Sequence, residues 1–138
     1  PPNFSKIETP CDELIESWSQ QVPSIEHLNA HQRNAIKHTL AAKDYSLILG
    51  MPGTGKTSTI SHIVATLVNQ GKKVLLTSYT HSAIDNLLLK LKQIGVSFLR
   101  LGKEDKMHPD IVPYSIHSRQ SMDDLKGIHF IGTVFFRM

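Results

Sequence analysis

The chain has 138 residues, of which 40% are hydrophobic, enough for about one globular domain with its own core. Its 15 basic residues exceed its 12 acidic residues, and the formal net charge of +3 is compatible with a nucleic-acid partner without requiring one. The single cysteine excludes a disulfide framework and a cysteine cluster for zinc or iron–sulfur, and no apolar run approaches the length of a membrane span, so we expect no membrane partner.

The N-terminal part of the chain, residues 1–27, is predicted to be a flanking segment with one short helix. Thr9 is a suitable N-cap, Pro10 suits the first helical position, and Pro23 ends the helix. A second helix is predicted from Asn29 to about Ala42. Asn29 is a good N-cap, and Gln32 follows it at the spacing of a capping box.

The chain is organised around residues 45–60, with the sequence YSLILGMPGTGKTSTI. The apolar run at 47–49 predicts a buried strand over Tyr45–Leu49, and a helix is predicted from Lys56 to about Gln70. Between them, residues 50–57 match the pattern of a phosphate-binding loop. The alternative is a glycine-rich turn that binds no ligand, but the strand before the pattern and the helix after it favour the loop.

Each residue type in this loop has a physical role in binding a nucleotide. The glycines let the backbone approach an anion closely, and the helix N-terminus adds positive potential. Lys56 is expected to reach the β- and γ-phosphates, and the Thr57 hydroxyl is expected to bind Mg²⁺, so ATP and Mg²⁺ are the predicted cofactors. The loop residues predicted to hold the nucleotide are Gly50, Met51, Pro52, Gly53, Thr54, Gly55, Lys56, Thr57 and Ser58.

The remaining elements predict an α/β fold of the P-loop NTPase class, a parallel β-sheet flanked by helices. Gly71 is expected to end the helix of the loop, and a helix is predicted over Ser82–Ile94 with Gly95 closing it. Strands are predicted over Lys73–Ser78, Phe98–Leu101 and Gly127–Thr133, and Gly102–Ser121 is expected to be a long surface excursion. Strands that alternate with helices favour a parallel sheet.

A second candidate functional segment, Thr77–Asn86, lies between a predicted strand and the helix that follows it, at the carboxyl edge of the sheet where ligands bind. It carries five hydroxyl side chains and a histidine. Two interpretations are about equally supported by the residues: Ser82 caps the helix and the rest is loop, or the hydroxyls and backbone N–H groups bind a nucleic-acid backbone.

Four segments, LNAHQRNAI, GMPGTGKTSTI, LLTSYTHSAIDNLLLKL and FLRLG with HPDI, stand in this order in the chain. Together they resemble the first RecA-like domain of a superfamily-1 helicase of the 5′-to-3′ type. More narrowly, they resemble the eukaryotic DNA replication ATP-dependent helicase/nucleases. The close match covers residues 28–111.

The resemblance implies a role for several residues. Gln32 matches an adenine-reading glutamine, and Lys56 and Thr57 match the catalytic pair that binds ATP and Mg²⁺. Thr80, His81 and Ser82 match the motif that grips the backbone of single-stranded DNA; Asp85 and Asn86 belong to this motif with a structural role as the alternative. The family also implies the nucleus as location, and single-strand-binding and replication-fork proteins as partners.

The chain departs from the family pattern after residue 133. It contains no Asp-Glu pair after its last strand, no second RecA-like domain with arginine fingers, and no nuclease domain with iron–sulfur cysteines. We therefore expect residues 28–138 to be the N-terminal part of the motor domain, incomplete at the C-terminus and inactive alone. The alternatives are a truncated nucleotide-binding module without catalytic activity, or another P-loop ATPase, such as a clamp-loader-type ATPase or an RNA helicase of the same superfamily.

Overall fold

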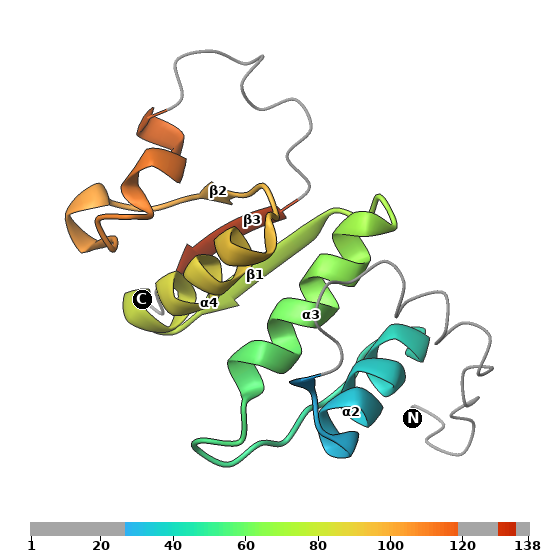
Figure 1. The fold of residues 1–138 in the computed structure, drawn as a ribbon. Helices are drawn as coiled ribbons and strands as arrows, with labels where there is room; N and C mark the ends of the chain where they lie inside the picture. Colours follow the sequence, from blue (N-terminus) through green and yellow to red (C-terminus); the bar gives the residue numbers. More distant parts are fainter. Residues whose placement is uncertain (1–26, 119–129, 135–138) are drawn as a thin grey trace. The chain divides into compact units, whose positions relative to one another are not determined.

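The computed structural model describes residues 27–118 and 130–134 of the chain (Figure 1). These residues divide between two compact units, 1–66 and 67–138. The short helix predicted after Thr9 lies outside the described residues, as do residues 127–129 of the last predicted strand.

In the first unit, helix α2 spans Ala30–Ala41, and the predicted capping box is confirmed. The Asn29 side chain accepts a hydrogen bond from the backbone N–H of Gln32, and the Asn29 N–H donates to Oε1 of Gln32, both over 2.9 Å. Two N–H groups of the helix start are satisfied in this way. Ile36 of α2 and Leu28 before it are buried.

The strand predicted over Tyr45–Leu49 is wrong for this structure, which assigns neither helix nor strand to residues 45–51. Leu47 and Leu49 are 89% and 98% exposed. A strand forms only where a neighbouring strand pairs with its N–H and C=O groups. Among the described residues, all three strands lie in the second unit, so the described part of the first unit offers this segment no partner.

Helix α3 spans Lys56–Asn69, which agrees with the prediction, and residues 59–66 of it are buried except Ile60. The helix ends as predicted at Gly71, where φ is +75°. The N–H of Gly71 donates to the carbonyl of Val68, and the N–H of Lys72 donates to the carbonyl of Leu67. This pair of bonds is the Schellman pattern, which needs a left-handed residue that glycine adopts without strain.

The second unit contains a sheet of three parallel strands, β1 Val74–Ser78, β2 Leu99–Arg100 and β3 Phe130–Val134, in the order β1-β3-β2 (Figure 1). Val74 lies opposite Phe130, and Leu99 lies opposite Ile131. The predicted parallel pairing is therefore confirmed for these strands.

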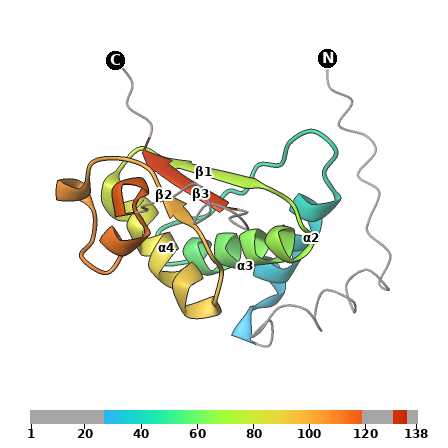
Figure 2. The same cartoon turned by 90° about the horizontal axis from the view of Figure 1, so that it is seen from above.

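Helix α4 spans His81–Ile94 and contacts β1 and β3, so that it covers one face of the sheet (Figure 2). Its predicted apolar stripe is buried: Ile84, Leu87, Leu88 and Leu91. These residues recur at the helical period, which places them on one side of the helix. Gly95 closes the helix with φ of +85°, as predicted.

The region after β2 is more structured than the surface excursion predicted for it. It contains three short 3₁₀ helices, η2 Glu104–Lys106, η3 Val112–Tyr114 and η4 Ile116–Ser118. Met107 and Ile111 are buried, and the Tyr114 ring stacks on Phe98 with 4.7 Å between ring centroids. Apart from the half-buried Glu104, the described prolines and the Lys, Asp and Glu side chains that favoured a loop are exposed, while a few apolar side chains fix the segment to the core.

Candidate nucleotide and nucleic-acid sites

The loop at residues 50–57 has the backbone conformation that a phosphate-binding loop needs at two of its glycines. The φ angles of Gly53 and Gly55 are +78° and +79°, a region that residues with a Cβ rarely adopt. The loop is tightened by Thr54, whose N–H and hydroxyl both donate to the carbonyl of Met51, over 3.3 and 2.7 Å. The chain then enters α3, whose first N–H groups have no partner within the helix.

Lys56 is exposed, and its side chain folds back across the loop. Its Nζ donates to the carbonyl of Gly50 over 2.7 Å. A Cβ on Gly50 would lie 2.6 Å from Cγ of Lys56, so the absence of a side chain at Gly50 leaves the room that the lysine uses. The lysine is thus already held beside the loop, where a cation is needed for phosphate binding.

Thr57 and Ser58 occupy the first turn of α3, where Thr57 is exposed and Ser58 is half-buried. The carbonyl of Thr57 accepts from the Ser61 hydroxyl over 2.7 Å, and the carbonyl of Ser58 lies 2.7 Å from Nδ1 of His62. Both of these bonds use the backbone carbonyls of Thr57 and Ser58 and not their side-chain hydroxyls. The exposed Thr57 side chain is compatible with the Mg²⁺ ligand role predicted for it.

The structure brings Gln32 together with the loop, although 23 residues separate it from Gly55. Its Nε2 donates to the carbonyl of Gly55 over 3.3 Å, while its Oε1 serves the capping box of α2. A side-chain amide has two N–H donors and two acceptor lone pairs. One N–H and one lone pair therefore remain, which is the combination required to recognise an adenine edge.

The second predicted site begins at Thr80, which the structure makes the N-cap of α4. Its Oγ1 accepts from the N–H of Ala83 over 3.3 Å. The interpretation that Ser82 caps the helix is therefore wrong, because the helix begins at His81, one residue earlier. Thr80 and Ser82 are exposed and His81 is half-buried. The Thr80 hydroxyl still has its own hydrogen to donate.

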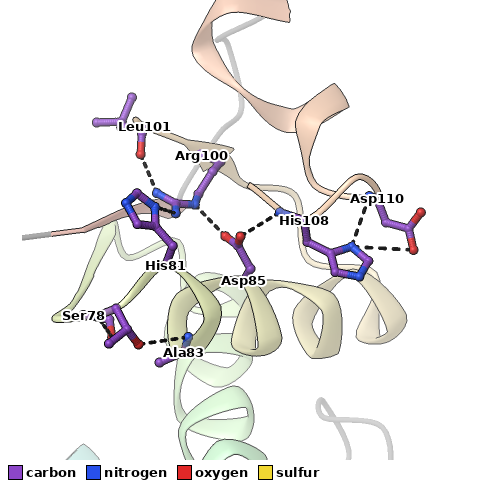
Figure 3. Close-up of polar contacts among 9 residues, drawn as sticks. Ser78, His81, Ala83, Asp85, Arg100, Leu101, His108 and Asp110 are labelled. Atoms are coloured by element: carbon purple, nitrogen blue, oxygen red, sulfur yellow. Dashed lines mark hydrogen bonds and ion pairs between the residues drawn. The ribbon is translucent and has the colours of Figure 1, made fainter. Parts of the chain in front are cut away.

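Asp85, for which the sequence left a structural role open, forms a buried ion pair with Arg100 (Figure 3). The Nε of Arg100 donates to Oδ1 of Asp85 over 2.8 Å, and Nη2 lies 3.3 Å from Nδ1 of His81. The sequence analysis did not identify Arg100 as a partner of this motif. The signal was present: two polar residues four apart on a helix, followed by an arginine in the next strand.

The phosphate-binding loop with Gln32 belongs to the first unit, whereas Thr80, His81 and Ser82 belong to the second. Across the described ranges, 27–118 and 130–134, there is no cluster of three or more His, Cys, Asp and Glu side chains that is arranged to hold a metal ion. The helices of these ranges include none long and apolar enough to cross a membrane.

Comparison with known proteins gives the family. The family model of the AAA domain matches residues 27–129. The DNA replication ATP-dependent helicase/nuclease DNA2 of Saccharomyces cerevisiae is 56% identical over 87 residues, covering 63% of this chain and 6% of the relative. Homo sapiens DNA2 is 57% identical over 88 residues, which cover 64% of this chain and 8% of the relative. Arabidopsis thaliana JHS1, which carries the same description, is 49% identical over 111 residues, which cover 79% of this chain and 8% of the relative.

The chain thus spans less than a tenth of the length of these relatives. With the family model covering most of the chain, the chain belongs to the AAA domain family of P-loop NTPases and is a DNA2-like superfamily-1 helicase fragment.

Proposed function

We propose that this chain is the part of a first RecA-like motor domain that binds ATP–Mg²⁺ and single-stranded DNA, within an ATP-dependent helicase/nuclease of DNA replication and repair. The observation that carries the proposal is the folded loop with Gly53 and Gly55 at positive φ, at the N-terminus of α3, in a sequence 48–59% identical to such enzymes. These relatives are named as DNA replication enzymes, which favours DNA over RNA and the nucleus as the compartment.

The donor groups of the loop fit a nucleoside triphosphate. Backbone N–H groups at the start of α3 and the ammonium of Lys56 are suited to phosphate oxygens, and the exposed Thr57 hydroxyl is suited to Mg²⁺. Bound Mg²⁺ would supply positive charge to the β- and γ-phosphates. We expect Gln32 to contribute base recognition, and its hydrogen bond to the same loop supports this role. The remaining loop residues, Met51, Pro52 and Thr54, shape the turn.

The nucleic-acid site that we propose consists of Thr80, His81 and Ser82. Two of these side chains are exposed hydroxyls, and all three lie at the N-terminus of a 14-residue helix, where the dipole favours negative charge. Such groups bind phosphates and sugars and read no base. In the whole enzyme, single-strand-binding and replication-fork proteins would be partners, and the iron–sulfur cluster would belong to the nuclease domain.

Nucleotide binding is tested by titrating the 138-residue chain with fluorescently labelled ATP in the presence of Mg²⁺. Lys56→Ala removes the cation beside the loop, and we expect it to abolish most of the binding. Lys90→Ala, at an exposed position of α4, is the matched control and should bind as wild type does. Equal affinity of wild type and Lys56→Ala would refute the role of Lys56.

Nucleic-acid binding is tested by fluorescence anisotropy with a labelled single strand at two salt concentrations. Backbone contacts release counterions, so affinity should fall as salt rises and should not depend on base sequence. A variant with Thr80, His81 and Ser82 all replaced by Ala should lose binding, whereas Ser97→Ala, at an exposed position outside the site, should not. A triple variant that binds as tightly as wild type would contradict the site.

A further inference from the structure

The guanidinium of Arg100 is fully buried and is hydrogen-bonded through all three of its nitrogens (Figure 3). Nε donates to Asp85, Nη1 donates to the carbonyl of Leu101, and Nη2 lies 3.3 Å from Nδ1 of His81. Both carboxylate oxygens of Asp85 are also engaged, because the second one accepts from the N–H of His108 over 2.8 Å. The arginine is therefore fixed in one orientation by its neighbours.

The helix places both side-chain partners of Arg100 on the same face of α4. His81 and Asp85 are four residues apart, which is the spacing of neighbours along a helix surface. The rigid fork of a guanidinium can bridge two such groups, whereas a lysine ammonium presents a single point charge. Gly102 lies against this fork: its φ is +132°, and a Cβ there would be 3.4 Å from Nη1.

The contact with Arg100 determines which nitrogen of His81 carries the hydrogen. An arginine side chain can only donate hydrogen bonds, so Nδ1 of His81 must be the acceptor. In the neutral imidazole, the hydrogen then lies on Nε2. An N–H at this position is a donor of the kind that contacts phosphodiester oxygens.

We propose that Arg100 and Asp85 are positioning residues of the nucleic-acid site: Asp85 orients Arg100, and Arg100 fixes His81 as the Nε2–H tautomer that donates to a phosphodiester oxygen of single-stranded DNA. This inference rests on the proposed function of Thr80, His81 and Ser82. It assigns a role in DNA binding to two buried residues that do not touch the nucleic acid.

A purely structural role would also require a buried ion pair, so the test must separate positioning from stability. Replacing a buried ion pair by apolar residues of similar volume often preserves the fold. The variant Asp85→Leu/Arg100→Met removes the donor to His81 in this way. Arg100→Lys is the second variant, which keeps the charge beside Asp85 but lacks the fork that also reaches His81.

The first readout is the tautomer, measured by ¹⁵N NMR of the full chain labelled at histidine, at about pH 8 so that imidazoles are neutral. His62 is an internal reference with the opposite tautomer, because its Nδ1 lies 2.7 Å from the carbonyl of Ser58, which can only accept. We expect His81 as Nε2–H in wild type and as a mixture in the variants, with His62 unchanged. An Nδ1–H tautomer of His81 in wild type, or no change in folded variants, would overturn the inference.

The second readout is affinity for a labelled single strand. We expect Asp85→Leu/Arg100→Met and His81→Ala each to weaken binding about tenfold, the order of one hydrogen bond to a charged group. Adding His81→Ala to the apolar pair should cause little further loss. Wild-type affinity of the apolar pair would overturn the inference. Failure of the wild-type chain to bind DNA would overturn the proposed function, and with it the phosphate contact, but would leave the tautomer result to be judged separately.

Discussion

Replacement of Asp85 alone by Leu should strongly destabilise the second unit. The Arg100 side chain is 0% exposed and that of Asp85 is 5% exposed, with 2.8 Å between Nε and Oδ1. Asp85→Leu would leave a buried guanidinium without its counter-charge and would also remove the acceptor of the His108 N–H. Breaking a buried pair by removing one partner costs about 3–5 kcal/mol. Domains of this size have roughly 5–15 kcal/mol of total stability, so this loss would remove at least about a fifth of it.

The assay is urea unfolding followed by circular dichroism. With a slope of about 2 kcal/mol per M, the midpoint of Asp85→Leu should fall by about 2 M. Arg100→Met should be affected similarly, but Asp85→Leu/Arg100→Met should lose much less than the sum of the two single losses, because no charge is left buried although the His108 N–H still lacks its acceptor. Asp105→Leu, at an exposed position of η2, is the control and should change stability by about 0.5 kcal/mol or less. A double variant destabilised by the sum of the two single losses would refute this reasoning, since the two charges would then act independently.

Three further predictions concern the two sites. Gly55→Ala should lower the free energy of unfolding by about 1–3 kcal/mol and weaken nucleotide binding, because φ is +79° and the added Cβ would overlap Nε2 of Gln32. Unchanged affinity in the nucleotide titration would contradict the need for glycine at this position. Thr80→Ala should lower the free energy of unfolding, measured in urea, by about 1 kcal/mol. Thr80→Asp should keep the cap to Ala83 but weaken DNA binding, because its carboxylate repels phosphates. Tight DNA binding by Thr80→Asp would count against the site. Phosphate release by the chain should stay at background with or without single-stranded DNA, because an arginine finger, which the family supplies from a second RecA-like domain, alone contributes about 10³–10⁵ in rate. DNA-stimulated release that disappears in Lys56→Ala would show a missed catalytic group.

Features fixed by neighbouring residues could be predicted from the sequence. The capping box of Asn29 and Gln32 depends on two residue types three positions apart, and the helix ends at Gly71 and Gly95 depend on the one residue type that adopts positive φ without strain. The buried stripe of α4 follows from the helical period alone. The phosphate-binding loop is likewise local, because its glycines, lysine and threonine are contiguous.

Features that depend on distant partners could not be predicted in the same way. An apolar run at 47–49 has the composition of a strand, but pairing is supplied by other segments, and the described part of the first unit has none. Arg100 reads in the sequence as one of several basic residues. Its importance comes from His81 and Asp85, which are 19 and 15 residues away and meet it only when α4 packs on the sheet.

Gln32 has a consequence for the reading of mutational data. Its one amide caps α2 through Asn29, holds the carbonyl of Gly55, and is the group that we propose to contact the base. Gln32→Glu would keep the cap but set a carboxylate against that carbonyl, and Gln32→Ala would remove all three functions together. In a saturation mutagenesis screen scored by growth or activity, position 32 would therefore tolerate few substitutions. That intolerance would overstate the contribution of Gln32 to base selectivity unless the helix content and loop geometry of the variants were also measured.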